Sequence, residues 1–212
     1  MLGPQDAAAF ERCIAVGGVA VFPSDTLYGL ACEPDSDDAV YRLYRMKGRL
    51  PDKPSAVMFF SVELALAALP ELGARTSAAL EALLPGAVTL LLPNPARRFL
   101  LACATDPETL GLRVPRLPAQ AAVLAHARSP VLQSSANHAG GQEARRLDQV
   151  APDIREAADL LLDGGELPGV ASTVVDLRGF EERGEWAIRR EGAVGAQEVD
   201  EAVRNISRPR ST

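Results

Sequence analysis

The chain has 212 residues, of which 47% are hydrophobic and 24% charged, the composition of an ordinary soluble protein. No apolar run approaches the roughly 20 residues that a membrane-spanning helix needs, and the N-terminus does not have the pattern of a secretory signal. A net charge of −6 argues against a surface that coats long nucleic acids.

The length suits a single domain, which we expect to cover residues 1–205, followed by a disordered tail at 206–212. Cys13, Cys32 and Cys103 form no C-x-x-C pair. This odd, scattered set favours free thiols and a cytoplasmic protein.

Short apolar runs alternate with helix-like segments along the whole chain. The runs predict strands at residues 18–22, 55–60, 87–93, 110–115, 130–135, 159–165, 172–177 and 185–191. The segments between them predict helices near residues 5–16, 37–47, 62–69, 76–84, 118–127, 147–159 and 196–205. This interleaving predicts an α/β fold in which helices flank a twisted, mixed sheet.

A polar triplet interrupts the first apolar stretch. The run ends at Pro23, and Ser24, Asp25 and Thr26 follow before a second apolar step. A surface turn needs fewer polar groups, so this triplet is a candidate part of a site.

The segment 37–47 has the signals of an amphipathic helix. Asp35 or Ser36 can cap its start, and Gly48 stands where a left-handed terminator belongs. Lys47 continues the apolar stripe of this helix, so we expect its side chain to reach along the buried edge toward a site. Residues 41–54 carry five basic residues against one acidic residue, which favours a small anionic ligand; a solvated helix face is the alternative.

Three later runs also end in small or charged polar residues: Arg113, then Ser134, Ser135 and Asn137, then Ser172 and Thr173. Side chains at strand ends of α/β sheets commonly converge on a ligand crevice. Hydroxyl, amide and cationic groups without an acid–base pair suit the binding and orientation of phosphates and carboxylates. Alternatively, these serines cap helices and form turns.

Several familiar sites are absent from the sequence. Neither G-x-x-x-x-G-K-[ST] nor G-x-G-x-x-G occurs, and there is no G-x-S-x-G elbow. With two histidines, no cysteine pair and no H-E-x-x-H, we expect no protein-held metal site.

Seven motifs, in order, carry a family resemblance. They are "FPSDTLYGLACEPDS", "YRMKGRLPDKP", "LLPGAVTLLLP", "LGLRVPRLP", "SSANHAGG", "GVASTVVDL" and "RREGAV". Together they resemble the YrdC family of threonylcarbamoyl-AMP synthases, in its short form, from about Val19 to Val194. The resemblance implies a YrdC-like fold with an open ligand crevice.

The resemblance also implies a reaction. L-threonine, bicarbonate or CO2, and ATP would give threonylcarbamoyl-AMP and pyrophosphate, with Mg2+ accompanying the nucleotide. A tRNA threonylcarbamoyltransferase would accept the product to form threonylcarbamoyladenosine in tRNA. No protein nucleophile is needed, so alignment and cationic charge would carry the catalysis.

Matching motif positions imply three sets of site residues. The threonine-binding set would be Thr26, Arg113, Ser135 and Ser172. The ATP-binding set would be Arg49, Lys53, Thr109, Gln133, Asn137, Glu143 and Arg190. Lys47 and Arg49 would be the catalytic pair that offsets phosphate charge.

Two alternatives stay open. Glu191 replaces the proline of the closing family motif, as in YciO-like relatives that would bind ATP without making the adenylate. Ser135, Asn137 and the Lys47-Gly48-Arg49 triplet favour the synthase. The other alternative is an RNA-binding module, which the acidic composition disfavours.

Overall fold

A computed structural model describes residues 1–50, 52–204 and 206. The disordered tail predicted at 206–212 therefore lies, except for Ile206, outside the described residues. Within them, no helix combines the length and apolar character needed to cross a membrane.

The described strands form one nine-stranded sheet with the order β7-β1-β2-β6-β3-β5-β4-β8-β9. The strands are β1 (Ala20–Pro23), β2 (Tyr28–Cys32), β3 (Ala56–Met58), β4 (Val88–Pro93), β5 (Thr109–Arg113), β6 (Val131–Ser135), β7 (Leu160–Leu161), β8 (Thr173–Asp176) and β9 (Ala187–Arg190). The pairs β1–β7, β3–β5 and β4–β8 are parallel, and the other five pairs are antiparallel. The predicted mixed sheet is thus confirmed.

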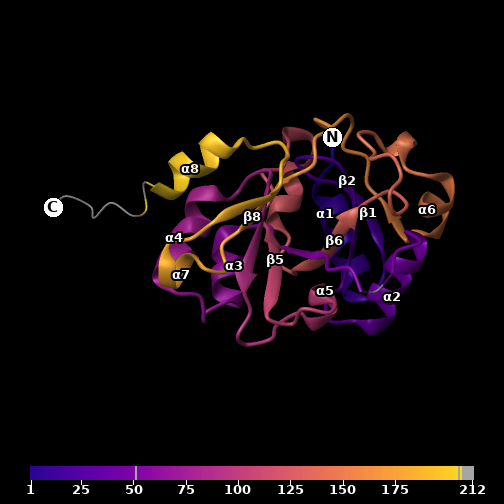
Figure 1. Cartoon of the computed structure of the whole chain (residues 1–212). Coiled ribbons are helices and arrows are strands. Elements are labelled where there is room, and N and C mark those ends of the chain that lie inside the picture. The colour runs from indigo at the N-terminus through magenta and orange to yellow at the C-terminus, as the bar shows by residue number, and fades with distance from the viewer. Residues whose placement is uncertain (51, 205, 207–212) are drawn as a thin grey trace.

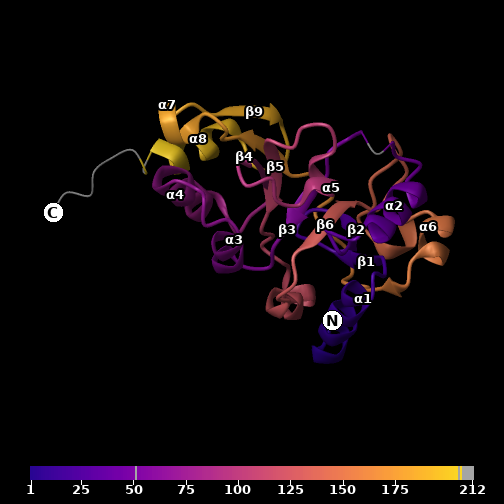
Figure 2. The same ribbon diagram turned by 90° about the horizontal axis from the view of Figure 1, so that it is seen from below.

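Helices lie on both sides of this sheet (Figures 1 and 2). The α-helices are α1 (Pro4–Ala15), α2 (Asp37–Met46), α3 (Val62–Ala68), α4 (Ala74–Leu83), α5 (Leu100–Cys103), α6 (Pro152–Ala157), α7 (Phe180–Arg183) and α8 (Ala196–Arg204). Two 3-10 helices, η1 (Ala119–His126) and η2 (Leu147–Gln149), complete the described set.

All eight apolar runs form strands, but some element predictions were wrong. Residues 118–127 contain a 3-10 helix rather than an α-helix, and the single helix expected at 147–159 is two short ones, η2 and α6. Pro152 stands at the first position of α6, where it breaks continuity with η2. Strand β2 and the one-turn helices α5 and α7 were not predicted.

Helix α2 has the predicted construction. The Ser36 hydroxyl accepts a hydrogen bond from the amide of Ala39 at 3.4 Å, and Gly48 has a φ of +58° just after the helix. Val40, Leu43 and Tyr44 are buried along one side. The Ser36 cap and the turn at Gly48 fix the two ends of α2, and so they fix the positions of Lys47 and Arg49, which follow the helix.

One face of the sheet is largely apolar. Val21, Leu30, Val57, Leu112 and Leu132 belong to the larger core cluster. The same cluster takes in residues of α2, α3, α4, α6 and α8, which therefore cover this face.

The opposite face has two unlike parts. Residues that pair across neighbouring strands have their side chains on the same face of the sheet. Phe22 pairs with Gly29, and Gly29 pairs with Ser135, so these three positions belong to the opposite face. At the β1 end this face packs against α1 and η1 through a second cluster that includes Phe10, Phe22 and Leu124. From β6 onward this face also carries polar side chains, among them Gln133, Arg113 and Thr89, and this polar part positions the site.

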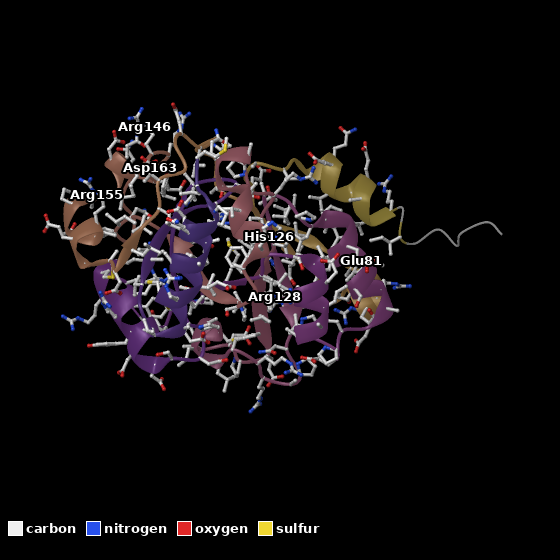
Figure 3. All side chains as sticks on the ribbon, turned by 180° about the vertical axis from the view of Figure 1, so that it is seen from behind. Glu81, His126, Arg128, Arg146, Arg155 and Asp163 are labelled. Carbon is white, nitrogen blue, oxygen red and sulfur yellow. The ribbon has the colours of Figure 1, made fainter. Side chains whose placement is uncertain are left out.

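The back of the molecule carries charged side chains over its helices and loops. Seen from behind, His126 and Arg128 lie over the middle of the molecule, and Arg146, Arg155 and Asp163 lie at one end (Figure 3). His126 and Arg128 are both exposed.

Candidate functional site

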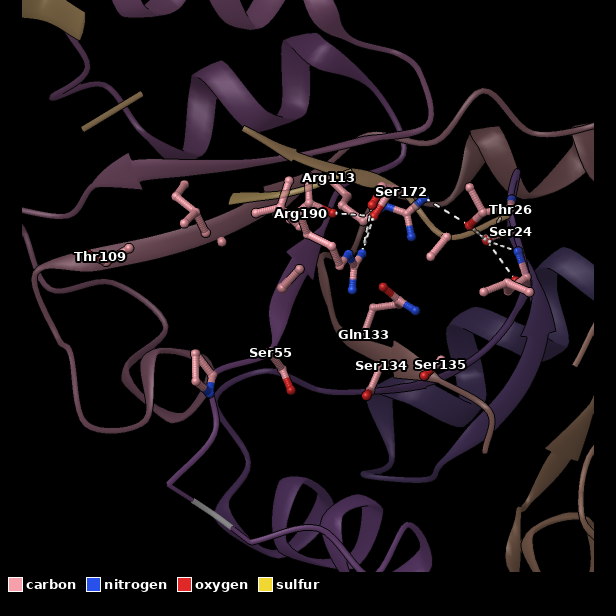
Figure 4. Close-up of a pocket in the computed structure, with 18 of the residues that line it drawn as sticks. Ser24, Thr26, Ser55, Thr109, Arg113, Gln133, Ser134, Ser135, Ser172 and Arg190 are labelled. Carbon is pink, nitrogen blue, oxygen red and sulfur yellow. Dashed lines mark hydrogen bonds between the residues drawn. The ribbon is translucent and has the colours of Figure 1, made fainter. Parts of the chain in front are cut away.

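A cavity of about 470 Å³ opens on the polar part of the second sheet face. Alternate residues of five neighbouring strands line it, including Gln133, Ala56, Gly111, Leu91 and Val174. Figure 4 shows the side chains of this cavity converging from strands and loops that are distant in sequence. A volume of this size suits a small-molecule ligand.

The polar triplet after β1 builds one end of the cavity. The Ser24 hydroxyl donates to the carbonyl of Leu27 at 2.7 Å and lies 3.0 Å from the Thr26 hydroxyl. The amides of Thr26 and Leu27 donate back to Ser24 Oγ at 3.2 and 3.3 Å. Ser24 therefore closes the turn, while Thr26 lines the cavity (Figure 4).

A buried ion pair stands beside Thr26. Arg113 Nη2 lies 2.7 Å from Asp25 Oδ1 and donates to Thr26 Oγ1 at 3.3 Å. The other Asp25 oxygen accepts the amide of Arg116 at 3.0 Å. Burial lowers the pKa of Arg113 and raises that of Asp25, because each charged form loses solvation. Arg113 Nε is buried and has no hydrogen-bond partner among the described residues.

A second hydroxyl cluster joins β4 to the residue just before β8. Thr89 Oγ1 and Ser172 Oγ are 2.8 Å apart and buried. Arg190 Nη2 donates to the carbonyl of Ser172 at 2.8 Å and to its hydroxyl at 3.2 Å. Arg190 is exposed, and its charge, after the larger effect of burial, also lowers the pKa of Arg113.

Arg49 forms another wall. Its guanidinium donates to Ser134 Oγ at 3.2 Å and to the carbonyls of Lys53 and Pro54. It also lies over the ring of Tyr44, 5.7 Å from the centroid. These contacts hold the guanidinium at the cavity, and all of its hydrogen-bond acceptors found among the described residues are uncharged oxygens.

The outer end is arranged around Asp176. Arg178 binds this carboxylate through Nε at 2.9 Å and Nη2 at 2.6 Å, and Arg189 binds it from β9. Arg178 Nη1 then donates to the Thr109 hydroxyl at 3.2 Å. The paired arginines hold the pKa of Asp176 far below its usual range.

The structure brings nine of the twelve predicted site residues together around the cavity. They are Thr26, Arg49, Thr109, Arg113, Gln133, Ser135, Glu143, Ser172 and Arg190. The remaining three, Lys47, Lys53 and Asn137, are not among the described residues that line it. Asn137 donates its amide to the carbonyl of Gly141 at 2.7 Å, and Lys53 is exposed.

Lys47 is buried but points at the protein backbone. Its ammonium donates to the carbonyls of Ser135 and Asn137, the latter at 2.6 Å. Burial, aided by the neighbouring Arg49 charge, lowers the pKa of Lys47 to about 8. The side chain is buried, as the stripe predicts, but it ends at the backbone of the loop after β6 and is not among the described residues that line the cavity.

Sequence reasoning missed several cavity residues. Thr89, Ser55 and Arg178 line the cavity, although none was singled out from the sequence. Period-two alternation along "AVTLLLP" places Thr89 on the same face as Leu91, and this signal could have identified it. Arg178 follows β8 after a turn, where alternation gives no guidance.

Gly29 lies where the apolar and polar parts of the face meet. A Cβ there would stand 2.9 Å from Gln133 Nε2 and 3.0 Å from the Phe22 ring. Gln133 can lie flat against the sheet only because position 29 lacks a side chain.

A second, shallower hollow of about 410 Å³ lies between α1 and α2. Arg42 and Asp159 in this hollow already pair at 2.6 Å. Burial and the nearby Asp159 raise the pKa of Cys13, which disfavours its thiolate. The charges of Arg42 and Asp159 are already paired with each other, and the reactive thiolate form of Cys13 is disfavoured. The first cavity is therefore the stronger candidate for a functional site.

Among the described residues there is no group of three or more His, Cys, Asp or Glu side chains that could hold a metal ion. His126 and His138 do not appear in the described lining of the cavity either. The donor set suits anionic ligands better than a protein-held metal.

Comparison with known proteins agrees with this geometry. The family model Sua5_yciO_yrdC, described as "Telomere recombination", matches residues 12–192. A threonylcarbamoyl-AMP synthase of Pyrococcus abyssi is 28% identical over 203 residues, which are 94% of this chain and 57% of that protein. The chain thus spans little more than half the length of this relative. A threonylcarbamoyl-AMP synthase of Xanthomonas campestris is 32% identical, over 78% of this chain and 89% of that protein.

Solved structures show the same fold. Pyrococcus abyssi Sua5 complexed with L-threonine aligns with a TM-score of 0.83 and 26% identity, over 95% of this chain and 58% of that one. Escherichia coli YciO aligns with a TM-score of 0.76 over 94% and 95% of the two chains. At 22% identity, the second likeness concerns the fold alone.

Proposed function

Because the chain belongs to the Sua5/YciO/YrdC family, we propose that it makes threonylcarbamoyl-AMP and pyrophosphate from L-threonine, bicarbonate or CO2, and ATP. The observation that carries this proposal is the cavity itself. It gathers Thr26, Arg113 and Ser172 at one end and Arg49 on a neighbouring wall, so an amino acid and a phosphate chain have adjacent places.

The chemistry needs alignment more than a reactive side chain. The threonine amine adds to CO2 and loses a proton, giving a carbamate. A carbamate oxygen then attacks the α-phosphorus of ATP, and pyrophosphate leaves as the bond to the β-phosphate oxygen breaks. Side chains that hold both substrates and offset their negative charge can accelerate this step without a covalent intermediate.

The amino acid would lie between Arg113 and Ser172. Arg113 lines the cavity with a guanidinium suited to the carboxylate, and the hydroxyls of Thr26 and Ser172 can bond the polar groups of threonine. The threonine complex of the Pyrococcus abyssi relative supports this assignment.

The nucleotide would occupy the remainder of the cavity. Arg49 is the cation best placed for phosphate, and Thr109, Gln133, Glu143 and Arg190 supply further contacts. Lys53 and Asn137 would add contacts to the nucleotide from neighbouring loops. The carbonyl of Lys53 accepts a hydrogen bond from Arg49, and the side-chain amide of Asn137 donates one to the carbonyl of Gly141. Mg2+ would be held by phosphates and water, since the protein supplies no carboxylate cage among the described residues.

The product would pass to a tRNA threonylcarbamoyltransferase, and we expect this to happen in the cytoplasm. Carbamates are labile, so the partial enclosure of the cavity would also protect the intermediate from water.

The direct test is a mass-spectrometric assay of the purified protein with ATP, Mg2+, bicarbonate and L-threonine. Threonylcarbamoyl-AMP and pyrophosphate should appear only in the complete mixture. ATP that stays intact, or that is hydrolysed equally without threonine, would contradict the proposal and favour a YciO-like ATP-binding protein. Filter binding at two salt concentrations would detect an RNA-binding module by a steep loss of affinity with salt.

A further inference from the structure

Lys47 connects the end of α2 to the loop after β6. Its ammonium donates to the carbonyls of Ser135 and Asn137, and its own carbonyl accepts the amide of Ala139 at 2.9 Å. The side chain is only 3% exposed. One residue therefore makes three bonds to a segment of five residues.

This segment carries two predicted ligand groups. Ser135 lines the cavity, and the Asn137 amide bonds the carbonyl of Gly141. Ser135 ends β6, where it pairs with Gly29 of β2, and the amide of Ala136 still donates to the carbonyl of Tyr28 at 2.8 Å. Beyond Ala136 the chain leaves the sheet, and the bonds of Lys47 to the carbonyls of Ser135 and Asn137 lie on either side of this point.

Arg49, two residues further along, has a different situation. Its guanidinium lines the cavity, whereas Lys47 is absent from the described lining. The turn at Gly48 separates the two side chains, so one faces the ligand space and the other faces the loop. The K-x-R pair therefore divides into a ligand-facing cation and a backbone-facing cation.

We propose that Lys47 is a positioning residue, which fixes the Ser135–Asn137 backbone through its carbonyls and so acts on the amino acid rather than on the phosphates. This inference rests on the proposed function, because it assigns Ser135 to L-threonine. It differs from a direct phosphate contact in a measurable way. A phosphate ligand affects nucleotide binding, whereas a support of Ser135 affects threonine binding even when no nucleotide is present.

The test is calorimetric titration of L-threonine into the wild type, Lys47→Met, Lys47→Arg and Arg49→Met without nucleotide, and of ATP–Mg2+ into the same proteins. Lys47→Met should weaken threonine binding by about tenfold or more, the effect of losing hydrogen bonds from a charged donor. Lys47→Arg retains N–H donors for both carbonyls and should recover most of that loss. Arg49→Met should weaken ATP binding and retain threonine binding.

Amide hydrogen exchange of the peptide covering residues 135–141 gives an independent readout. It should be faster in Lys47→Met than in the wild type and normal in Arg49→Met. If Lys47→Met fails to fold, Lys47→Gln keeps one N–H donor group at this position and replaces it in both measurements.

The outcomes separate this inference from the proposed function. Unchanged threonine affinity and unchanged exchange in Lys47→Met, with weaker ATP binding, would overturn the positioning role and restore a phosphate contact. A wild type that does not bind threonine would contradict the proposed function instead. Hydrogen exchange would then still decide whether Lys47 holds the loop.

Discussion

Ser172 presents its hydroxyl to the cavity, and Thr89 determines where that hydroxyl points. Their oxygens lie 2.8 Å apart in a buried pair, and Arg190 approaches the same Ser172 oxygen from the mouth. Of these two partners, Thr89 is the buried one, since Arg190 is exposed. Thr89 is therefore the better-fixed reference for the position of the serine.

Replacing Thr89 by valine removes this partner at nearly constant volume. We expect the KM for threonine to rise by roughly three- to tenfold, the effect of about 1 kcal/mol for one hydrogen bond, with a smaller change for ATP. Steady-state kinetics with each substrate varied in turn measures this.

Thr76→Val is the matched control for this substitution. Thr76 is also buried, lies in α4, and its hydroxyl has no partner among the described residues. An equal rise in KM in both variants would mean that the Thr89 effect is general rather than specific to Ser172.

Single residues were predictable from the sequence where they end a strand. Thr26, Arg113, Ser135 and Ser172 were identified because each follows or ends an apolar run, and all four line the cavity. Asp25 belongs to the polar triplet named from the sequence, but its pairing with Arg113, 88 positions away, was not predicted. A long-range pairing of this kind leaves no local signal in a single sequence.

Helix α4 shows how one element can complete another. Its N-cap is Gly73, which has no side chain to bond the free amides. The Glu181 carboxylate of α7 supplies this function and accepts the amides of Thr76 at 2.7 Å and Arg75 at 3.4 Å. It also places a negative charge at the positive end of the helix.

Glu181→Ala should therefore lower the free energy of unfolding by about 1 kcal/mol, the usual effect of losing an N-cap. Urea denaturation measures this, and the KM values should not change because α4 and α7 lie outside the cavity lining.

Glu182→Ala provides the comparison for Glu181→Ala. The Glu182 side chain is 81% exposed, and its one ion pair is with the adjacent Arg183. We expect little change in stability there. Equal losses in both variants would argue against the capping role.

Elements were predictable where their hydrophobic pattern was strong. Helix α2 was anticipated down to its cap and terminating glycine, because Ser36 and Gly48 bound a clear stripe. Residues 118–127 have almost no amphipathic character, and tertiary packing against α1 decides their 3-10 form. Strand β2 is short and fully buried, so it shows no alternation.

At the scale of the whole molecule, Asp176 links three strands. Its carboxylate binds Arg178 and Arg189, which joins β8 to β9, and Arg178 continues to Thr109 on β5. Because the folded pKa lies below the unfolded value, the unfolded chain binds the proton more readily. This contribution is complete above about pH 4 and is lost as pH falls through and below that value.

Asp176→Asn should thus destabilise the protein at pH 7 and have a smaller effect at pH 3. Losing hydrogen bonds from charged groups should cost about 1.5 kcal/mol or more at neutral pH. Urea denaturation across this pH range measures the difference between the variant and the wild type.

The exposed Glu156→Gln provides a control for loss of a carboxylate. A constant difference between Asp176→Asn and the wild type at all pH values would show that the charge of Asp176 is not what stabilises the fold.

The ends of the sheet bear on how the protein behaves in crowded solution. Strand β7 has two residues, and β9 ends in the exposed arginines Arg189 and Arg190. A long, apolar edge strand would offer backbone donors and acceptors to another chain, whereas a very short edge or a charged one offers a poor template. The order of the strands therefore also guards against aggregation, because the longest strand, β4, lies inside the sheet.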